Sequence, residues 1–434
     1  MKKILFLCDH LARTGYGIVS EQIVARLIDY FGDKIAIHIV AINYFGEPVK
    51  MATGIAGQSE NAVINVYIES GKLSQDKERT PEHMEQDNFG RMVFIERLAQ
   101  IDFDGIFILQ DLGIIQPIIP ILKGIKEAKK TTNRKQFKSI FYFPVDGEIH
   151  PKYYKDLEFF DLLVTYTEFG RGQLLKHRPE LQPKVKVVPH GTDTNDFFCF
   201  NELNGVGNRH AFRKEYFGDN SKKFIISNIN RNQPRKDIPT TIFGFIEAKK
   251  IWGDLKHWKE PFLYLHMHPC DPLGNDLKCL LEQTDLIEGV DYMFPKTDSD
   301  VFQVDTPTLN KIYNASDCYV TTTRGEGWGL SVTEAMATGL PVIIPNHTSL
   351  AEIGANGRAL FLSEFNSVCD LQDNIIRDKC NEFEVAERII DVANMKYVDY
   401  HRLDLITQNA LEWVRGLSWE NICKRWVDYF KEVY

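Results

Sequence analysis

The 434-residue sequence predicts an α/β protein of two domains, each a mostly parallel sheet with helices on both faces. Short apolar runs alternate with helix-length amphipathic segments in both halves of the chain. These runs are apolar at nearly every position, which is typical of parallel strands that are buried on both faces. Two domains are expected because a chain of this length exceeds what one ordinary hydrophobic core accommodates.

The first half opens with an apolar run at residues 1–9 that we interpret as a buried first strand. A secretion signal is the alternative, but the run stops after about five apolar residues, short of what such a signal needs. Residues 35–42 are the next expected strand, because they are almost all apolar. Further strands are expected at 106–109, 140–143, 162–165 and 185–188, and an exposed polar loop at 74–88.

The alternation breaks at residues 195–223, where Asn, Gly and charged residues cluster, so a domain junction is expected there. The last segment, 419–434, carries aromatic and aliphatic residues near helical spacing. The sequence therefore predicts a first domain over 1–200, a second over 201–415 and a final amphipathic helix over 416–434. In the second domain, strands are expected at 224–227, 262–265, 318–321 and 342–344, with a helix at 240–251.

Composition and charge narrow the class of protein. With 44% hydrophobic and 26% charged residues, the chain has the profile of a globular protein, and its net charge of −9 argues against bulk attraction to nucleic acid or anionic lipid. The eight cysteines are scattered without a C-x-x-C pair, which favours reduced thiols over a zinc site or a disulfide framework. No stretch approaches the roughly 18 apolar residues that span a bilayer. A cytoplasmic location is expected.

One basic stretch, 123–138, departs from this acidic balance, with seven Lys and Arg residues opposed only by Glu127. It is a candidate for contact with an anionic membrane, at its inner face, or with a phosphate-bearing acceptor, nucleic acid included. The alternative, which we favour, is a solvated helix end and loop.

The most informative segment is 324–342, which follows an expected strand, opens with a glycine-rich turn and continues into a helix that Gly339-Leu340-Pro341 ends. In a βα unit such a turn lies at the carboxyl end of the sheet, where ligands bind. Gly325, Gly327 and Gly329 allow backbone N–H groups to approach a ligand closely, and the helix start adds unsatisfied donors and a partial positive charge.

Two carboxylates frame this turn, Glu326 in the loop and Glu334 in the helix. Glu334 falls about one turn into the helix, on the side that faces the loop. Both can therefore flank one bound molecule, with Glu326 at its reacting end and Glu334 bonding hydroxyls farther along. The alternative is that both are surface acids and Trp328 is a core residue.

A second element, 228–237, follows the first strand of the second domain and places Arg231 and Lys236 around a proline-containing turn. Two cations at the carboxyl end of a strand suit a diphosphate. Alone, such a cluster is more often a solvated turn, and the neighbouring acidic loop reverses that balance. A third element, Gly15 and Gly17 after the first strand, lacks the spacing and acidic partner of a dinucleotide fingerprint, so a nicotinamide cofactor is disfavoured.

These motifs resemble those of the retaining glycosyltransferases of the GT-B fold, specifically glycosyltransferase family 4 (glycosyl transferases group 1). The resemblance covers nearly the whole chain and is strongest over 227–352, with supporting motifs at 189–193, 314–317 and 418–420. It implies two Rossmann-like domains that face a central cleft, with the C-terminal helix crossing back to the first domain.

The resemblance also implies roles for single residues. Glu326 is expected to contact the donor sugar and to stabilise its developing positive charge, and Glu334 to bind the ribose hydroxyls. The remaining donor-binding residues implied are Arg231 and Lys236 at the diphosphate, the backbone of Gly327, Trp328, Gly329 and Leu330 at the sugar and diphosphate, and Gly15 and Gly17, which are expected to touch phosphate or acceptor.

The chain departs from the family pattern at a few positions. Asn230 replaces the usual glycine before the arginine, and Trp328 the usual phenylalanine. Many relatives carry a histidine after the strand that ends here at Phe143, but this chain has none in that turn. We therefore expect Asp146 to face the donor sugar as a second catalytic residue. A lone aspartate in a turn is as often structural.

The activity implied is transfer of a hexose, with retention of anomeric configuration, from a UDP- or GDP-linked sugar to an acceptor that the sequence does not identify. The acceptor classes left open are lipid, glycan, protein and nucleic acid, and the oligomeric state is also open. No metal or other cofactor is expected, because fixed cations and a helix N-terminus supply the positive charge and no acidic cluster is spaced for a metal.

Rival functions remain at this stage. A sugar-nucleotide epimerase or an inverting transferase has the same architecture. A phosphorylase is less favoured, since no lysine is placed to carry a pyridoxal cofactor. A catalytically silent nucleotide-sugar-binding protein is a rival from another class, and the presence of both Glu326 and Lys236 argues against it.

Overall fold

The computed structural model describes residues 1–12, 14–44, 46–52, 64–71, 89–200, 209–253, 255, 258–295, 304–370 and 375–434. The chain forms two compact units. Unit 1 consists of Met1–Val145, Ile149–Gly191 and Trp419–Tyr434, and unit 2 of Asp146–Glu148 and Thr192–Ser418. The main division thus falls after Gly191, whereas the sequence suggested residue 200. The loop expected at 74–88 lies outside the described residues.

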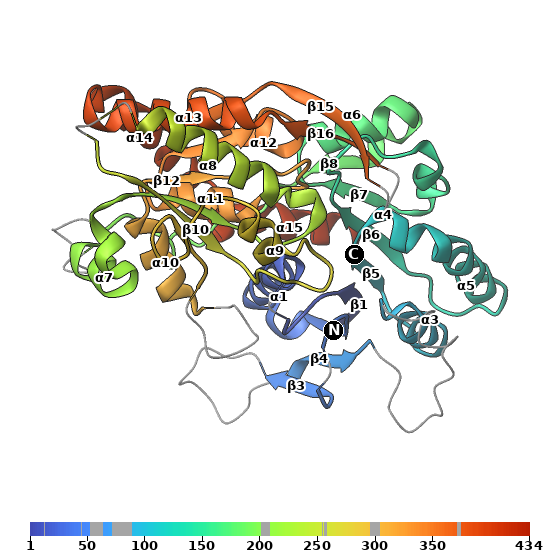
Figure 1. Cartoon of the computed structure of the whole chain (residues 1–434). Helices are drawn as coiled ribbons and strands as arrows, with labels where there is room; N and C mark the ends of the chain where they lie inside the picture. The colour runs from blue at the N-terminus through green and yellow to red at the C-terminus, as the bar shows by residue number, and fades with distance from the viewer. Residues whose placement is uncertain are drawn as a thin grey trace. The chain divides into compact units, whose positions relative to one another are not determined.

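Unit 1 is built on one eight-stranded sheet with the order β3-β4-β2-β1-β5-β6-β7-β8 (Figure 1). All neighbouring strands run parallel except β3, which pairs antiparallel with β4. The strands are β1 (Lys2–Cys8), β2 (Ile35–Ala41), β3 (Val49–Ala52), β4 (Ile64–Ser70), β5 (Gly105–Leu109), β6 (Lys138–Phe143), β7 (Leu162–Thr165) and β8 (Val185–Val187). The helices are α1 (Gly15–Phe31), α3 (Arg91–Gln100), α4 (Leu112–Ile115), α5 (Ile119–Thr131), α6 (Glu168–His177) and α15 (Trp419–Val433).

The C-terminal helix α15 belongs to unit 1, although the chain reaches it only after unit 2. Its apolar face packs against α1 and the sheet: the Trp426 ring lies 4.7 Å from that of Tyr142 and 5.3 Å from that of Phe107. The hydroxyl of Tyr434 donates to the carbonyl of Ile106 at 2.6 Å. Large aromatic side chains thus hold this helix within unit 1, and the predicted return of the last helix to the first domain is confirmed.

Unit 2 contains a six-stranded parallel sheet with the order β11-β10-β9-β12-β13-β14. Its strands are β9 (Phe224–Ile229), β10 (Pro261–His266), β11 (Tyr292–Met293), β12 (Cys318–Val320), β13 (Val342–Pro345) and β14 (Leu360–Leu362), and an antiparallel hairpin follows as β15 (Phe365–Asp370) and β16 (Ile375–Cys380). Its helices are α7 (Arg209–Phe217), α8 (Ile238–Trp252), α9 (Leu277–Glu282), α10 (Thr306–Ala315), α11 (Leu330–Ala337), α12 (Thr348–Gly354), α13 (Glu382–Tyr397) and α14 (Tyr400–Gly416).

Strands β9 and β10 of unit 2 are buried along nearly their whole length, as their largely apolar sequences predict. Helices α8 and α13 lie side by side over one face of the sheet (Figure 1). They approach closely at Gly244, where a Cβ atom would stand 2.4 Å from a methyl carbon of Val385. The two parallel sheets confirm the predicted α/β class. The hairpin β15–β16 was not predicted.

Two of the supporting sequence motifs have structural roles. Asp317, before β12, is buried and accepts hydrogen bonds from Arg213 at 2.7 Å and from the N–H of Ile225 at 2.7 Å. Burial opposes ionisation of this carboxyl, but Lys396 and Arg213 hold its pKa well below the usual range. A buried charge of this kind is tolerated only when it is paired, so the aspartate fastens α7 and α13 to the sheet of unit 2.

The first three residues of the motif at 189–193 lie at the end of unit 1. His190 is buried with its ring 4.2 Å from that of Tyr166, and burial lowers its pKa to about 3. A Cβ atom at Gly191 would stand 2.5 Å from the ring of Trp419, so only glycine fits beside that indole. The motif therefore seats the first residue of α15.

Candidate functional site

The candidate site lies where two neighbouring parallel strands of unit 2 end. Strand β9 continues into the loop with Lys236, and the adjacent β12 continues into the loop with Glu326. The loops are joined by a hydrogen bond from the N–H of Arg324 to the carbonyl of Arg235, at 2.7 Å. Because carboxyl ends of parallel strands meet at one sheet edge, residues about 90 positions apart become neighbours.

Glu326 and Lys236 form a buried ion pair at this edge. The Lys236 ammonium contacts one carboxylate oxygen of Glu326, and the Arg235 guanidinium contacts the other at 3.2 Å. The Glu326 side chain is only 8% exposed. Burial raises the pKa of Glu326, but the charges of Lys236 and Arg235 outweigh it and bring the pKa to about 2. The carboxylate is therefore ionised and fixed between two cations.

Burial has the opposite effect on the two cations. It lowers the pKa of Lys236, and the negative charge of Glu326 only partly compensates. For Arg235, burial lowers the pKa, but Glu326 and Asp146 raise it by more. The sequence identified Lys236 but missed its neighbour Arg235. In the sequence, the only indication of a role for Arg235 was that it directly precedes Lys236.

Two residues with unusual backbone conformations hold the loops in place. Asp237 has a φ of +47° and pairs with Arg324 at 3.2 Å. Thr348, at the start of α12, has a φ of +50°, and its hydroxyl accepts a hydrogen bond from the N–H of Glu326 at 3.2 Å. For a β-branched residue this conformation costs about 1–3 kcal/mol and persists only where surrounding contacts enforce it. Such strain is typical of functional sites.

Glu334 lies on α11, the helix that follows the glycine-rich loop. Its carboxylate accepts a hydrogen bond from the Tyr313 hydroxyl at 2.8 Å, and burial raises its pKa to about 7. Both Glu334 and Glu326 are close enough to Tyr319 to raise the pKa of that buried hydroxyl, after burial itself. The structure thus places the two predicted acids near one tyrosine, and their contact with one bound molecule stays a prediction.

The glycine-rich loop is shaped by close approaches. Gly329 precedes α11 with a φ of +110°, a conformation that side chains disfavour. Gly327 is partly buried, and Leu330 is the first helical residue. Trp328 is buried, its ring 6.5 Å from that of Trp413, and its carbonyl accepts from the Ser349 hydroxyl at 2.6 Å. The indole is thus a core group, and only the backbone of this residue remains a candidate contact.

Arg231 is set apart from the Glu326 pair. Its guanidinium pairs with Asp271 at 2.8 Å, and its side chain is 57% exposed. It lies on the same loop as Lys236, but its guanidinium pairs with Asp271 rather than with Glu326. The structure therefore brings Lys236 and Glu326 together directly, and leaves Arg231 at the rim of the same loop.

Asp146 is part of unit 2 although it directly follows strands of unit 1 in the sequence. Its carboxylate lies 3.2 Å from the Arg377 guanidinium and 4.0 Å from that of Arg235. Arg377 comes from β16 of the unpredicted hairpin and also pairs with Asp370 at 3.1 Å. The structure thus places the predicted Asp146 next to the Glu326 cluster. No sequence signal pointed to Arg377.

Gly15 and Gly17 begin α1 in unit 1. The N–H of Gly17 donates to the Thr14 hydroxyl, which caps the helix, and a Cβ atom there would stand 2.0 Å from the carbonyl oxygen of Ala12. A close turn before the helix therefore accounts for Gly17. Contact of these glycines with a ligand stays a prediction.

The basic stretch 123–138 is largely neutralised within unit 1. Lys129 is buried and pairs with Asp102 at 2.7 Å, and Lys123 pairs with Asp156 at 2.6 Å. Six of the seven basic side chains form such pairs, the others being Lys126, Arg134, Lys135 and Lys138. Paired charges attract phosphates weakly, so this favours the solvated-surface alternative over membrane or nucleic-acid contact.

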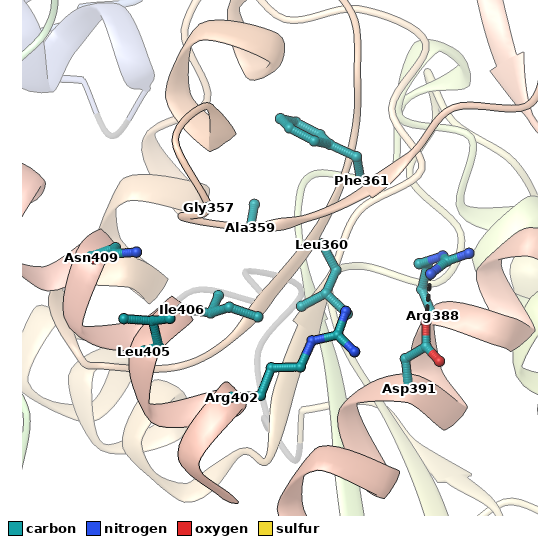
Figure 2. Close-up of a pocket in the computed structure, with 10 residues that line it drawn as sticks. All are labelled: Gly357, Ala359, Leu360, Phe361, Arg388, Asp391, Arg402, Leu405, Ile406 and Asn409. Atoms are coloured by element: carbon teal, nitrogen blue, oxygen red, sulfur yellow. Dashed lines mark hydrogen bonds and ion pairs between the residues drawn. The ribbon is translucent and has the colours of Figure 1, made fainter. Parts of the chain in front are cut away.

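A separate hollow of about 380 Å³ in unit 2 is lined by β14, α13 and α14 (Figure 2). Arg388, paired with Asp391 at 2.5 Å, and Arg402 lie on one side of it, and Leu405 and Ile406 on another (Figure 2). None of its lining residues belongs to the Glu326 cluster.

Among the described helices, none is long and apolar enough to cross a membrane. Among all the residues that the structure describes, no group of three or more acidic, His or Cys side chains is arranged to hold a metal ion.

Comparison with known proteins identifies a family model that matches part of the chain. Residues 276–394, which include Glu326 and Glu334, match the family model "Glycosyl transferases group 1". Mannosylfructose-phosphate synthase of Agrobacterium fabrum is 25% identical over 215 residues, which is 48% of this chain and 42% of that protein. The match thus spans less than half the length of this curated relative.

Solved structures resemble the whole chain. HepE from Anabaena, in complex with UDP and glucose, is 13% identical with a TM-score of 0.63, over 99% of this chain and 100% of that one. Sucrose-phosphate synthase from Thermosynechococcus elongatus is 15% identical with a TM-score of 0.66, over 100% and 99%. At these identities the likeness shows the fold, and the family model adds a match over part of the chain. The chain has the GT-B fold, and its residues 276–394 match the glycosyl transferases group 1 family.

Proposed function

We propose that this chain is a retaining glycosyltransferase that moves a hexose from a nucleoside-diphosphate sugar to an acceptor hydroxyl. The observation that carries the proposal is the buried Glu326 carboxylate, held ionised by Lys236 and Arg235 at the carboxyl ends of two neighbouring parallel strands. Buried opposite charges at such an edge are a common arrangement of catalytic sites, because the protein pays their burial cost in advance.

The charges match the demands of the reaction. Cleavage of the sugar–phosphate bond puts positive character on the ring and negative charge on the departing diphosphate. Lys236, Arg231 and the N-terminus of α11 supply positive charge for the phosphates, and Glu326 supplies negative charge for the ring. Because a diphosphate is more negative than one carboxylate, it draws the Lys236 ammonium, and this frees oxygens of Glu326 for the sugar.

The proposed step conserves atoms and charge. The bond between the anomeric carbon and the diphosphate oxygen breaks, and its electron pair stays on that oxygen. The acceptor hydroxyl bonds to the anomeric carbon on the same face, and its proton passes to the departing diphosphate. Unlike a glycosidase, this scheme needs no pair of carboxylates on opposite sides of the bond. Asp146 is assigned a role beside the sugar and Glu334 one at the ribose hydroxyls.

The relatives suggest which donor to test first. HepE is described in complex with UDP-glucose, and other relatives are named as sucrose-phosphate and mannosylfructose-phosphate synthases. We therefore propose UDP-glucose as the first donor and GDP-mannose as the second. The acceptor stays open, because the match to the curated relative covers less than half of that protein.

The test starts with thermal shift against a panel of nucleotide sugars. A ligand at one hundred times its Kd stabilises the folded protein by about 2.7 kcal/mol, which is an easily measured shift. The best donor is then followed by release of nucleoside diphosphate, and the anomeric configuration of the product is determined from NMR coupling constants. Inversion would reject the retaining mechanism. Binding without turnover in the presence of varied acceptors would favour a silent binding protein, and an isomerised donor would indicate an epimerase.

A further inference from the structure

The Glu326 pair is one end of a longer chain of ion pairs within unit 2. Cations and anions alternate along it, so each charge except the terminal ones has an opposite charge on both sides. Such networks are held more rigidly than isolated surface pairs. In order, the members are Lys236, Glu326, Arg235, Asp146, Arg377, Asp370, Arg324 and Asp237, and successive contacts after the first measure 3.2, 4.0, 3.2, 3.1, 3.7 and 3.2 Å.

Arg377 is the most buried side chain of this network, at 2% exposure. One terminal nitrogen bonds Asp370 on the facing strand of the hairpin, and the other bonds Asp146. A buried guanidinium is costly unless anions meet its fork of donors, and here two carboxylates do so from different directions. The hairpin therefore presents this cation to Asp146 in a fixed geometry.

The backbone of residues 146–148 packs as closely against its neighbours as the Asp146 side chain does. A Cβ atom at Gly325 would stand 1.9 Å from the carbonyl oxygen of Asp146, and one at Gly147 would stand 2.8 Å from a methyl carbon of Ile375. Glu148 forms an antiparallel bridge with Ile376 of β16. Two glycines and a backbone bridge thus place this segment between the glycine-rich loop and the hairpin, which leaves the Asp146 carboxylate little freedom.

We infer that Arg377 is a positioning residue of the donor site, and that the hairpin β15–β16 serves to bring it to Asp146. This inference rests on the proposed function. The guanidinium fixes the Asp146 carboxylate beside Arg235, which in turn contacts Glu326. Arg377 acts through Asp146 on the sugar end of the site, because its guanidinium pairs with the Asp146 carboxylate.

A double-variant cycle tests this with UDP-glucose as donor probe and GDP-mannose as the second probe. Arg377→Lys keeps the charge but cannot bond two carboxylates with a rigid fork, and Asp146→Asn keeps the shape but removes the charge. Each is expected to lower kcat for donor consumption about tenfold and to leave the Kd for UDP within twofold. The double variant is expected to be no slower than Asp146→Asn alone, because one residue acts through the other. Arg388→Lys, at an arginine paired with Asp391 outside the network, is the matched control.

A second readout does not depend on activity. Amide hydrogen exchange of a peptide covering 146–148 is expected to speed up in Arg377→Lys and to stay unchanged in Arg388→Lys. If the wild-type protein consumes none of the nucleotide sugars in the panel but this exchange difference is seen, the proposed function fails while the positioning contact stands. The inference is overturned by wild-type kcat in Arg377→Lys, by losses that multiply in the double variant, by a loss of UDP affinity as large as that of kcat, or by unchanged exchange at 146–148.

Discussion

Replacement of Glu326 by glutamine measures how much the buried charge of this residue contributes to the free energy of unfolding. In the native protein burial raises the pKa of this carboxyl, but Lys236 and Arg235 lower it by more, from 4.5 to about 2. A shift of that size corresponds to about 3 kcal/mol of preference for the ionised form in the folded state. Glutamine resembles the neutral form at every pH. We therefore expect Glu326→Gln to destabilise unit 2 by about 3 kcal/mol at pH 7.

The sign of the pH dependence follows from the lowered pKa. The contribution is fully present above about pH 4.5, where the carboxyl is ionised in both the folded and the unfolded chain, and it is lost as the pH falls toward 2. Urea unfolding of both proteins at pH 7, 5.5, 4.5 and 3.5 measures the difference, with Glu247→Gln as control for a surface pair worth under about 1 kcal/mol. Equal stabilities at pH 7, or a difference that stays undiminished at pH 3.5, would refute the reasoning.

Three further predictions use the same site. Lys236→Ala is expected to slow transfer at least tenfold, about 1.4 kcal/mol of transition-state stabilisation, whereas Lys250→Ala, at an exposed lysine of α8, leaves the rate unchanged; initial rates at saturating donor decide it. Because burial raises the pKa of Glu334 to about 7 and ribose hydroxyls bond best to the ionised form, calorimetry is expected to show nucleoside-diphosphate affinity rising from pH 6 to 8, and this dependence should be absent in Glu334→Gln. Gly325→Ala places a methyl group 1.9 Å from the carbonyl oxygen of Asp146 and is expected to cost about 1–3 kcal/mol of stability in thermal unfolding; Gly416→Ala, whose added Cβ would meet no atom within 4 Å, is the control, and equal melting temperatures would contradict the close approach.

The periodicity of the sequence was enough to predict most of the sheets. Strands such as β2 and β5 are apolar at almost every position, and burial between two layers of helices accounts for that pattern. The hairpin β15–β16 escaped notice because its exposed and buried positions give no such run. The break at 195–223 marked the region of the division between units, but the structure places that division earlier, after Gly191.

Local patterns were also enough to propose Glu326, Glu334 and Lys236, because a glycine-rich turn before a helix and a basic turn after a strand each have a chemical meaning in a short window. They did not show which of Arg231 and Arg235 contacts Glu326, since two residues four positions apart on one loop can both lie near it. The structure pairs Arg235 with Glu326 and turns Arg231 to Asp271. The placement of Asp146 beside this cluster was proposed from the resemblance, and the role assigned to it stays a prediction.

By itself, the sequence determined the α/β class and the loops in which the proposed site residues lie, because these depend on spacing along the chain, and the family resemblance implied the return of the last helix to the first domain. Only the tertiary structure decided which charges meet. The pairing of Glu326 with Lys236 and Arg235, and of Asp146 with Arg377, joins residues from 90 to 231 positions apart. Contacts over such separations depend on which strands become neighbours and on how closely glycines let the loops approach. No local stretch of sequence determines either of these.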